Sequence, residues 1–173
     1  MTNLTVESRR PAAGMKTTTV DIADMKVTND PNDVLVTYSL GSCVGLSLYD
    51  TAARVGGLIH CMLPLSSIDP EKAGTRPYMF VDTGVTALLT MLFGMGAQRQ
   101  NIIAKVAGAG SPLGQEETFR IGQRNYTILR KLLWKNNILI NAEDVGGTKA
   151  RTMYLYMPDG RTTVKSAGKE VPL

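Results

Sequence analysis

The residues best suited to covalent chemistry lie close together in the sequence. Residues 43–61 contain both cysteines of the chain, Cys43 and Cys61, and its only histidine, His60. A thiol with an imidazole in reach attacks acyl carbons at neutral pH, because the imidazole takes the thiol proton. Such a pair predicts a cysteine that alkylates well below the free-thiol pKa of about 8.5.

Strand periodicity separates the two cysteines. Residues 44–49 and 57–63 are apolar and joined by a short polar turn, which predicts an antiparallel hairpin. Side chains alternate between the faces of a strand, so His60 and Cys61 are expected on opposite faces. We therefore expect Cys61 to be a small core residue and His60 to be available to Cys43.

The approach to Cys43 is glycine-rich. Gly41 and Ser42 precede it, and a glycine turn lets a ligand approach the backbone closely. The free N–H groups of such a turn can hold a developing oxyanion. Two structural alternatives stand beside this interpretation: free cysteine is commonly a core residue, and His60 can be a core histidine with its hydrogen bonds satisfied. A Cys/Cys/His zinc site lacks a fourth ligand, so no metal is expected.

Longer motifs resemble one protein family. The pattern is Thr37, then Leu-Gly-Ser-Cys-Val-Gly at 40–45, then Gly56-Gly57, His60 and Pro64. It resembles CheD, the chemoreceptor glutamine deamidases. Residues 122–125 (Gly-Gln-Arg-Asn) are similar to the family's G-E-R-N, and 144–147 to its D-V-G-G. Two departures are Gln123 in place of glutamate and Ala-Gly-Ala-Gly at 107–110 in place of a G-G-A turn.

The resemblance implies roles for particular residues. Cys43 corresponds to the family's nucleophile, His60 to its base and Thr37 to the threonine that orients the base. Ser42 and Gly41 lie in the loop expected to hold the oxyanion. The implied fold is a β-sandwich-like core flanked by helices, related to the cysteine deamidases of bacterial toxins.

The resemblance also implies an activity and partners. The reaction is conversion of glutamine side chains of methyl-accepting chemotaxis receptors to glutamate, without a cofactor. The family also binds the CheC phosphatase and stimulates it. The alternatives are a non-catalytic adaptor that binds CheC or receptors, and a thiol hydrolase acting on a different amide or ester.

Composition limits the function classes. With 173 residues and 43% hydrophobic residues, the chain is long enough to bury one sizeable core. No apolar run is long enough to span a bilayer, and no signal peptide is evident, so a cytoplasmic protein without membrane insertion is expected. The formal charge is only +4, and the basic residues are scattered, which argues against nucleic acid as a partner. The glycines at 108 and 110 lack the third glycine of a dinucleotide site.

The order of expected elements predicts an α+β fold with two main helices outside a predominantly antiparallel sheet core. Residues 1–16 are expected to form a flexible tail, and 17–173 a single CheD-like domain. The long segment 64–77 either borders the site or is an ordinary surface loop. The expected strands are 20–27, 34–39, 44–49, 57–63, 101–107, 138–142 and a hairpin of 152–157 with 161–165, and the expected helices are 81–95 and 121–135.

Overall fold

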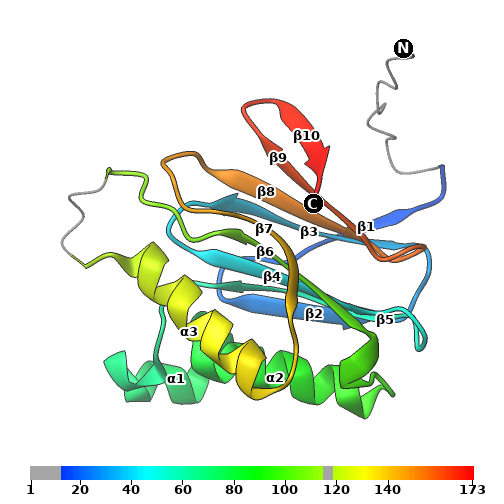
Figure 1. The fold of residues 1–173 in the computed structure, drawn as a ribbon, viewed down its shortest axis with the longest axis horizontal. Coiled ribbons are helices and arrows are strands. Elements are labelled where there is room, and N and C mark those ends of the chain that lie inside the picture. Colours follow the sequence, from blue (N-terminus) through cyan, green and yellow to red (C-terminus); the bar gives the residue numbers. More distant parts are fainter. Residues whose placement is uncertain (1–12, 115–118) are drawn as a thin grey trace.

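Two five-stranded sheets stack face to face in the computed structural model, which describes residues 13–114 and 119–173 (Figure 1). All strand pairs within the two sheets are antiparallel except β1 with β3 and β6 with β7. Sheet A has the order β1 (Lys16–Thr19), β3 (Asp33–Leu40), β8 (Arg151–Tyr156), β9 (Arg161–Ser166) and β10 (Lys169–Pro172). Sheet B has the order β2 (Asp24–Thr28), β5 (Val55–Cys61), β4 (Val44–Asp50), β6 (Ile102–Gly108) and β7 (Ile140–Val145).

Two helices cover the outer face of sheet B, as Figure 1 shows: α2 (Val81–Gly94) and α3 (Ile121–Lys135). Strands β4 and β5 are therefore buried on both faces, and every residue in them is buried. One core cluster fills the space between sheet B and the helices, and a second fills the space between the sheets. The predicted α+β class, with a mainly antiparallel sandwich and two main helices, is confirmed.

The helices follow their apolar spacing. The buried residues of α2 recur every three or four positions along Val81, Val85, Leu88 and Leu92, which places them on one face. The buried positions of α3 are Gly122, Asn125, Leu129 and Leu133, again three or four apart, and one of them is polar.

Four expectations about elements need correction. The predicted strand 20–27 is wrong in its first half, because Ala23 has a positive φ of 60° and the chain turns there between β1 of sheet A and β2 of sheet B. Lys16, assigned to the tail, begins β1, while residues 1–12 lie outside the described part. Strand β7 begins and ends later than 138–142, and β10 was not expected.

The segment 64–77 is not an open loop. It contains a short 3₁₀ turn, η1 (Ser66–Ile68), and helix α1 (Pro70–Thr75), and it leads into η2 (Pro77–Met79). The Asp69 side chain caps α1 by accepting from the Lys72 N–H. Ser66 donates its N–H and its hydroxyl to the Asp82 carboxylate, which pins the segment to the start of α2. A further 3₁₀ turn, η3 (Arg99–Asn101), precedes β6.

None of the helices described is long and apolar enough to cross a membrane.

A buried arginine ties the two sheets together where β7 leads into β8. Arg151 is only 3% exposed and donates to Asp144 Oδ1 at 3.0 Å and to the Gly146 carbonyl at 2.8 Å. Burial raises the pKa of Asp144, but the hydrogen bond and charge of Arg151, with the charge of Lys149, outweigh it and leave this pKa below its ordinary value. The carboxylate thus stays ionised and holds the turn at 146–147.

We expect Asp144→Asn to lower the free energy of unfolding by about 2 kcal/mol at pH 7, the scale of a charge-assisted hydrogen bond. Because the folded pKa is depressed, this stabilisation is present above the unfolded carboxyl pKa of about 3.9 and is lost as pH falls through the folded pKa. Urea unfolding curves should therefore converge for wild type and variant at acidic pH. Asp159→Asn, at an exposed pair with Arg161 (3.8 Å), is the control and should change little. An equal difference at all pH values would contradict the role given to the ion pair.

Candidate active site

A hydrogen bond between the two sheets joins Thr37 and His60. Thr37 lies on β3 of sheet A and His60 on β5 of sheet B, and both are fully buried. Thr37 Oγ1 lies 2.7 Å from His60 Nδ1. The two sheets thus place an imidazole and a hydroxyl in contact across the core.

The hydroxyl decides which imidazole nitrogen carries the proton. Thr37 Oγ1 also lies 2.7 Å from the Val20 carbonyl, which can only accept. A threonine hydroxyl has one proton, so that proton goes to Val20 and Oγ1 accepts from His60 Nδ1–H. The neutral imidazole therefore has its lone pair on Nε2, and this buried atom has no hydrogen-bond partner among the residues described.

The imidazole is neutral at physiological pH. Burial lowers the pKa of His60 to about 4, while the negative charge of Asp21 opposes the shift. Nε2 is therefore a free proton acceptor over the pH range in which most enzymes work.

The two cysteines lie on opposite sides of sheet B, and the predicted hairpin is confirmed by the pairing of β4 with β5. Cys43 is partly buried and packs against the cluster between the sheets, where Thr37 and His60 meet. Cys61 is fully buried in the cluster under the helices, against Gly84 of α2. The expected separation of Cys61 from His60 is confirmed, and it places the members of a Cys/Cys/His zinc site on different faces.

Burial favours the protonated form of both thiols in the free protein. Burial raises the pKa of Cys43, and its own backbone N–H opposes this only in part. Burial also raises the pKa of Cys61 strongly, reinforced by the charges of Cys43 and Asp82. The direction of this shift is opposite to the expected ionisation of the Cys43 thiol well below pH 8.5, because desolvation outweighs the influences that favour the thiolate.

The exit of β6 holds the loop that carries Cys43. The Ala109 N–H donates to the Cys43 carbonyl at 2.7 Å, and the Gly110 N–H donates to the Gly41 carbonyl at 2.8 Å. Gly108 has a φ of +96°, and a Cβ there would lie 2.4 Å from the Cys43 carbonyl oxygen, so only glycine fits. The Ala-Gly-Ala-Gly at 107–110, a departure from the family turn, thus supports this loop.

Asn125 of α3 holds the same loop from another direction. Its side chain is fully buried, and Nδ2 donates to the Ser42 carbonyl at 3.0 Å and to the Met62 carbonyl at 2.9 Å. It therefore connects the Cys43 loop to the end of the His60 strand. Sequence reasoning assigned Asn125 no role. The available signal was a polar residue at a core position of an amphipathic helix, within the Gly-Gln-Arg-Asn motif.

These contacts engage the carbonyl groups of the loop but not the N–H groups of Ser42 and Cys43. Gly41 N–H donates to the Ser39 carbonyl, so it is engaged. The N–H groups of Ser42 and Cys43 donate to no backbone carbonyl in the part of the chain that the structure describes. They are the groups available to an incoming oxyanion.

Asp21 acts on His60 through its charge, and no carboxylate among the described residues is hydrogen-bonded to Thr37, His60 or Cys43. Asp50 is a buried turn residue that accepts from the N–H groups of Ala52, Ala53 and Gln98. Within 13–114 and 119–173, no three His, Cys, Asp or Glu side chains are grouped as metal ligands would be. Cys43 and His60 supply the site with a thiol and a neutral imidazole.

The family model and the curated relatives point to the same family. The family described as CheD chemotactic sensory transduction matches residues 62–166. The chain is 49% identical over 149 residues to the probable chemoreceptor glutamine deamidase CheD 1 of Syntrophus aciditrophicus (strain SB), covering 86% of this chain and 93% of the relative. It is 47% identical over 154 residues to the probable chemoreceptor glutamine deamidase CheD of Solibacter usitatus (strain Ellin6076), covering 89% and 91%.

A solved structure with lower similarity is the hypothetical protein YfiH of Bacillus licheniformis, with a TM-score of 0.46 and 18% identity over 70% of this chain and 49% of that one. The two relatives at 47–49% identity align with this chain over 91–93% of their own length. The chain therefore belongs to the CheD family.

Proposed function

We propose that this protein is a cysteine-dependent chemoreceptor glutamine deamidase. It hydrolyses glutamine side chains on the cytoplasmic helices of methyl-accepting chemotaxis receptors to glutamate and ammonia, so it acts in the cytoplasm. The names of the relatives supply the substrate. The observation that carries the proposal is the Thr37–His60 hydrogen bond, which leaves Nε2 as a free base on the Cys43 side of sheet B.

In the first half-reaction, Cys43 Sγ attacks the carboxamide carbon while His60 Nε2 takes the thiol proton. The carbonyl oxygen becomes an oxyanion, which the N–H groups of Ser42 and Cys43 bind. The C–N bond then breaks, and the proton on Nε2 passes to the leaving nitrogen. Ammonia departs and a thioester remains.

In the second half-reaction, His60 Nε2 takes a proton from water as the water oxygen attacks the thioester carbon. The same N–H groups hold the second oxyanion. The C–S bond breaks, Sγ recovers the proton from Nε2, and glutamate is released. The sum is one glutamine and one water converted to one glutamate and one ammonia.

The lowered pKa of His60 suits this sequence. An imidazolium whose pKa is about 4 gives its proton readily to the departing nitrogen. The thiol and the imidazole both start neutral, so no buried ion pair has to be maintained between turnovers. Charge develops only after substrate has arrived.

By the family resemblance, we include binding of a CheC-type phosphatase in the proposal. This activity requires no nucleophile, so Cys43→Ala should separate an adaptor role from catalysis.

The first test replaces each cysteine. Cys43→Ala should abolish ammonia release from a receptor cytoplasmic fragment, because no other thiol lies on the His60 side of the sheet. Cys61→Ala, the matched control, should keep activity at a packing cost of about 1 kcal/mol. Intact mass of the fragment should rise by about one dalton for each glutamine hydrolysed by the acyl-enzyme route. A folded Cys61→Ala that is inactive beside an active Cys43→Ala would reverse the assignment.

A second test measures the ionisation of Cys43 in a Cys61→Ala background. The rate of alkylation by iodoacetamide should rise with pH through a midpoint above about 8.5, because burial raises the pKa of this thiol. In the same protein, kcat/KM should fall only as the pH drops towards about 4, where His60 becomes protonated and can no longer accept. An alkylation midpoint below pH 7 would instead indicate a preformed thiolate.

A third test addresses Thr37. Thr37→Val removes the acceptor of His60 Nδ1–H and should lower kcat by about tenfold to a hundredfold, equivalent to the loss of one buried hydrogen bond. Thr37→Ser keeps the hydroxyl and should retain most activity. Because the chain has one histidine, ¹⁵N NMR reports its tautomer directly. Wild type should show the Nδ1–H form, and an Nε2–H form would refute the orientation.

A further inference from the structure

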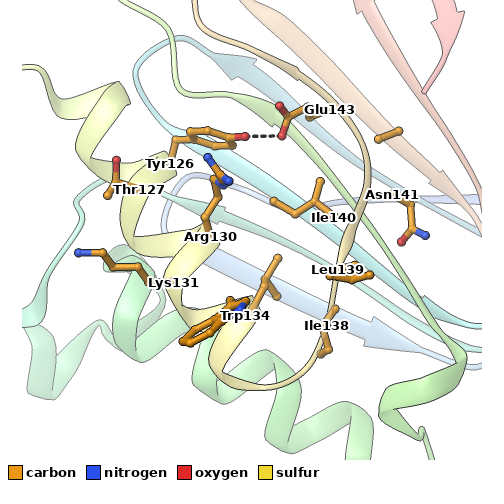
Figure 2. A pocket seen from close by; sticks show the side chains of 12 residues that line it. Tyr126, Thr127, Arg130, Lys131, Trp134, Ile138, Leu139, Ile140, Asn141 and Glu143 are labelled. Atoms are coloured by element: carbon orange, nitrogen blue, oxygen red, sulfur yellow. Dashed lines mark hydrogen bonds between the residues drawn. The ribbon is translucent and has the colours of Figure 1, made fainter.

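A groove lies between α3 and β7, away from the catalytic residues. It has a volume of about 790 Å³. Figure 2 shows Trp134 on the helix side and Leu139 on the chain leading into β7. These two side chains are 75% and 78% exposed, which is unusual for residues of this size and places apolar surface in contact with water.

The helix that forms one wall of the groove is cationic. Helix α3 contains four basic residues and no acidic one, and two of the four, Arg130 and Lys131, line the groove. Neither of these two takes part in any ion pair formed among the described residues. Glu143 is the one carboxylate among the residues that line the groove beside these two cations, so the groove carries a net positive charge.

One end of the groove is closed by side-chain contacts. The Tyr126 hydroxyl donates to Glu143 of β7, as Figure 2 shows, so this carboxylate is engaged. The Arg130 guanidinium lies 5.6 Å from the centre of the Tyr126 ring. These contacts link α3 to β7 and hold Arg130 in place.

The groove and the Cys43 loop are linked through α3. Asn125, which holds the Cys43 loop, immediately precedes Tyr126. An α-helix rises about 1.5 Å per residue, so Trp134 lies about 14 Å along the axis from Asn125. A ligand that spans this length of α3 extends from the turn that carries Asn125 to the exposed Trp134.

We propose that the α3–β7 groove docks an acidic, amphipathic helix of the protein substrate. Carboxylates of that helix contact Arg130 and Lys131, and its apolar side chains cover Trp134 and Leu139. The hollow shape fits a helix, whose diameter with side chains is about 10 Å, better than it fits a planar membrane surface. The identity of the occupant as a receptor helix rests on the proposed function.

The occupant's charge also follows from the reaction. Each deamidation converts a neutral carboxamide to a carboxylate, so a helix that carries several reacting glutamines becomes more acidic as it is processed. Arg130 and Lys131, about one and a half helical turns from Asn125, attract such a helix and set its register, which selects the glutamine presented to Cys43.

The test uses Trp134, the only tryptophan, as a probe. A tryptophan-free receptor cytoplasmic fragment is titrated into the full-length Cys43→Ala protein, in which no turnover occurs. Emission of Trp134 should shift to shorter wavelength, and Kd should rise severalfold between about 50 and about 500 mM salt as screening increases.

Two variants test the groove in that background. Arg130→Glu with Lys131→Glu should raise Kd at least tenfold. Lys165→Glu with Lys169→Glu, at exposed positions of sheet A, changes net charge equally and should bind like the parent. Leu139→Ser keeps all charges and the probe and should raise Kd severalfold. Circular dichroism and urea unfolding confirm that each variant folds.

The proposal is overturned if the fragment binds without a shift in Trp134 emission. It is also overturned if the Arg130→Glu, Lys131→Glu variant binds the fragment as tightly as the Lys165→Glu, Lys169→Glu control. A shift with anionic phosphatidylglycerol vesicles but not with the fragment would assign the groove to a membrane surface instead. Ammonia release by wild type is measured on the same fragment. Docking without ammonia release contradicts the deamidase assignment alone, whereas ammonia release without a Trp134 shift contradicts the groove alone.

Discussion

The hydrogen bond from His60 to Thr37 is the contact on which the site depends. It crosses the interface between the sheets, so it exists only when both sheets are formed and packed at this level. Its direction depends in turn on the Val20 carbonyl, which accepts the single hydroxyl proton of Thr37. The consequence is a buried Nε2 without a hydrogen-bond partner among the described residues, a group whose desolvation costs about 1–3 kcal/mol until substrate chemistry supplies a proton.

In the loop that carries Cys43, hydrogen bonds engage the carbonyl groups more than the N–H groups. Its carbonyls are bound by Ala109 and Gly110 of the β6 exit and by Asn125 of α3, while the N–H groups of Ser42 and Cys43 donate to no backbone carbonyl among the described residues. In the proposed mechanism these two N–H groups bind the oxyanion. Backbone donors held in this way are most effective in a site from which water is excluded, because they require no reorganisation during the reaction. The same burial keeps the thiol protonated and makes the imidazole a neutral base.

Helix α3 serves two purposes through two faces. Its buried face supplies Asn125 to the catalytic loop, and its exposed face supplies Arg130, Lys131 and Trp134 to the groove. Because a helix is stiff over this length, a substrate positioned on the exposed face has a defined distance to the thiol. In the proposed docking mode, this arrangement joins substrate selection to catalysis within one element of the fold.

Local pattern in the sequence was enough to determine the helices, the β4–β5 hairpin and the opposite orientations of His60 and Cys61, because periodicity along one segment depends only on nearby residues. The pairing of β1 with β3, the role of Asn125 and the direction of the Thr37 hydroxyl were decided by the tertiary structure. So was the raised pKa of Cys43, which sequence reasoning expected to be low. Each of these depends on desolvation or on partners distant in the chain, and such contacts form only when the two sheets and α3 pack together.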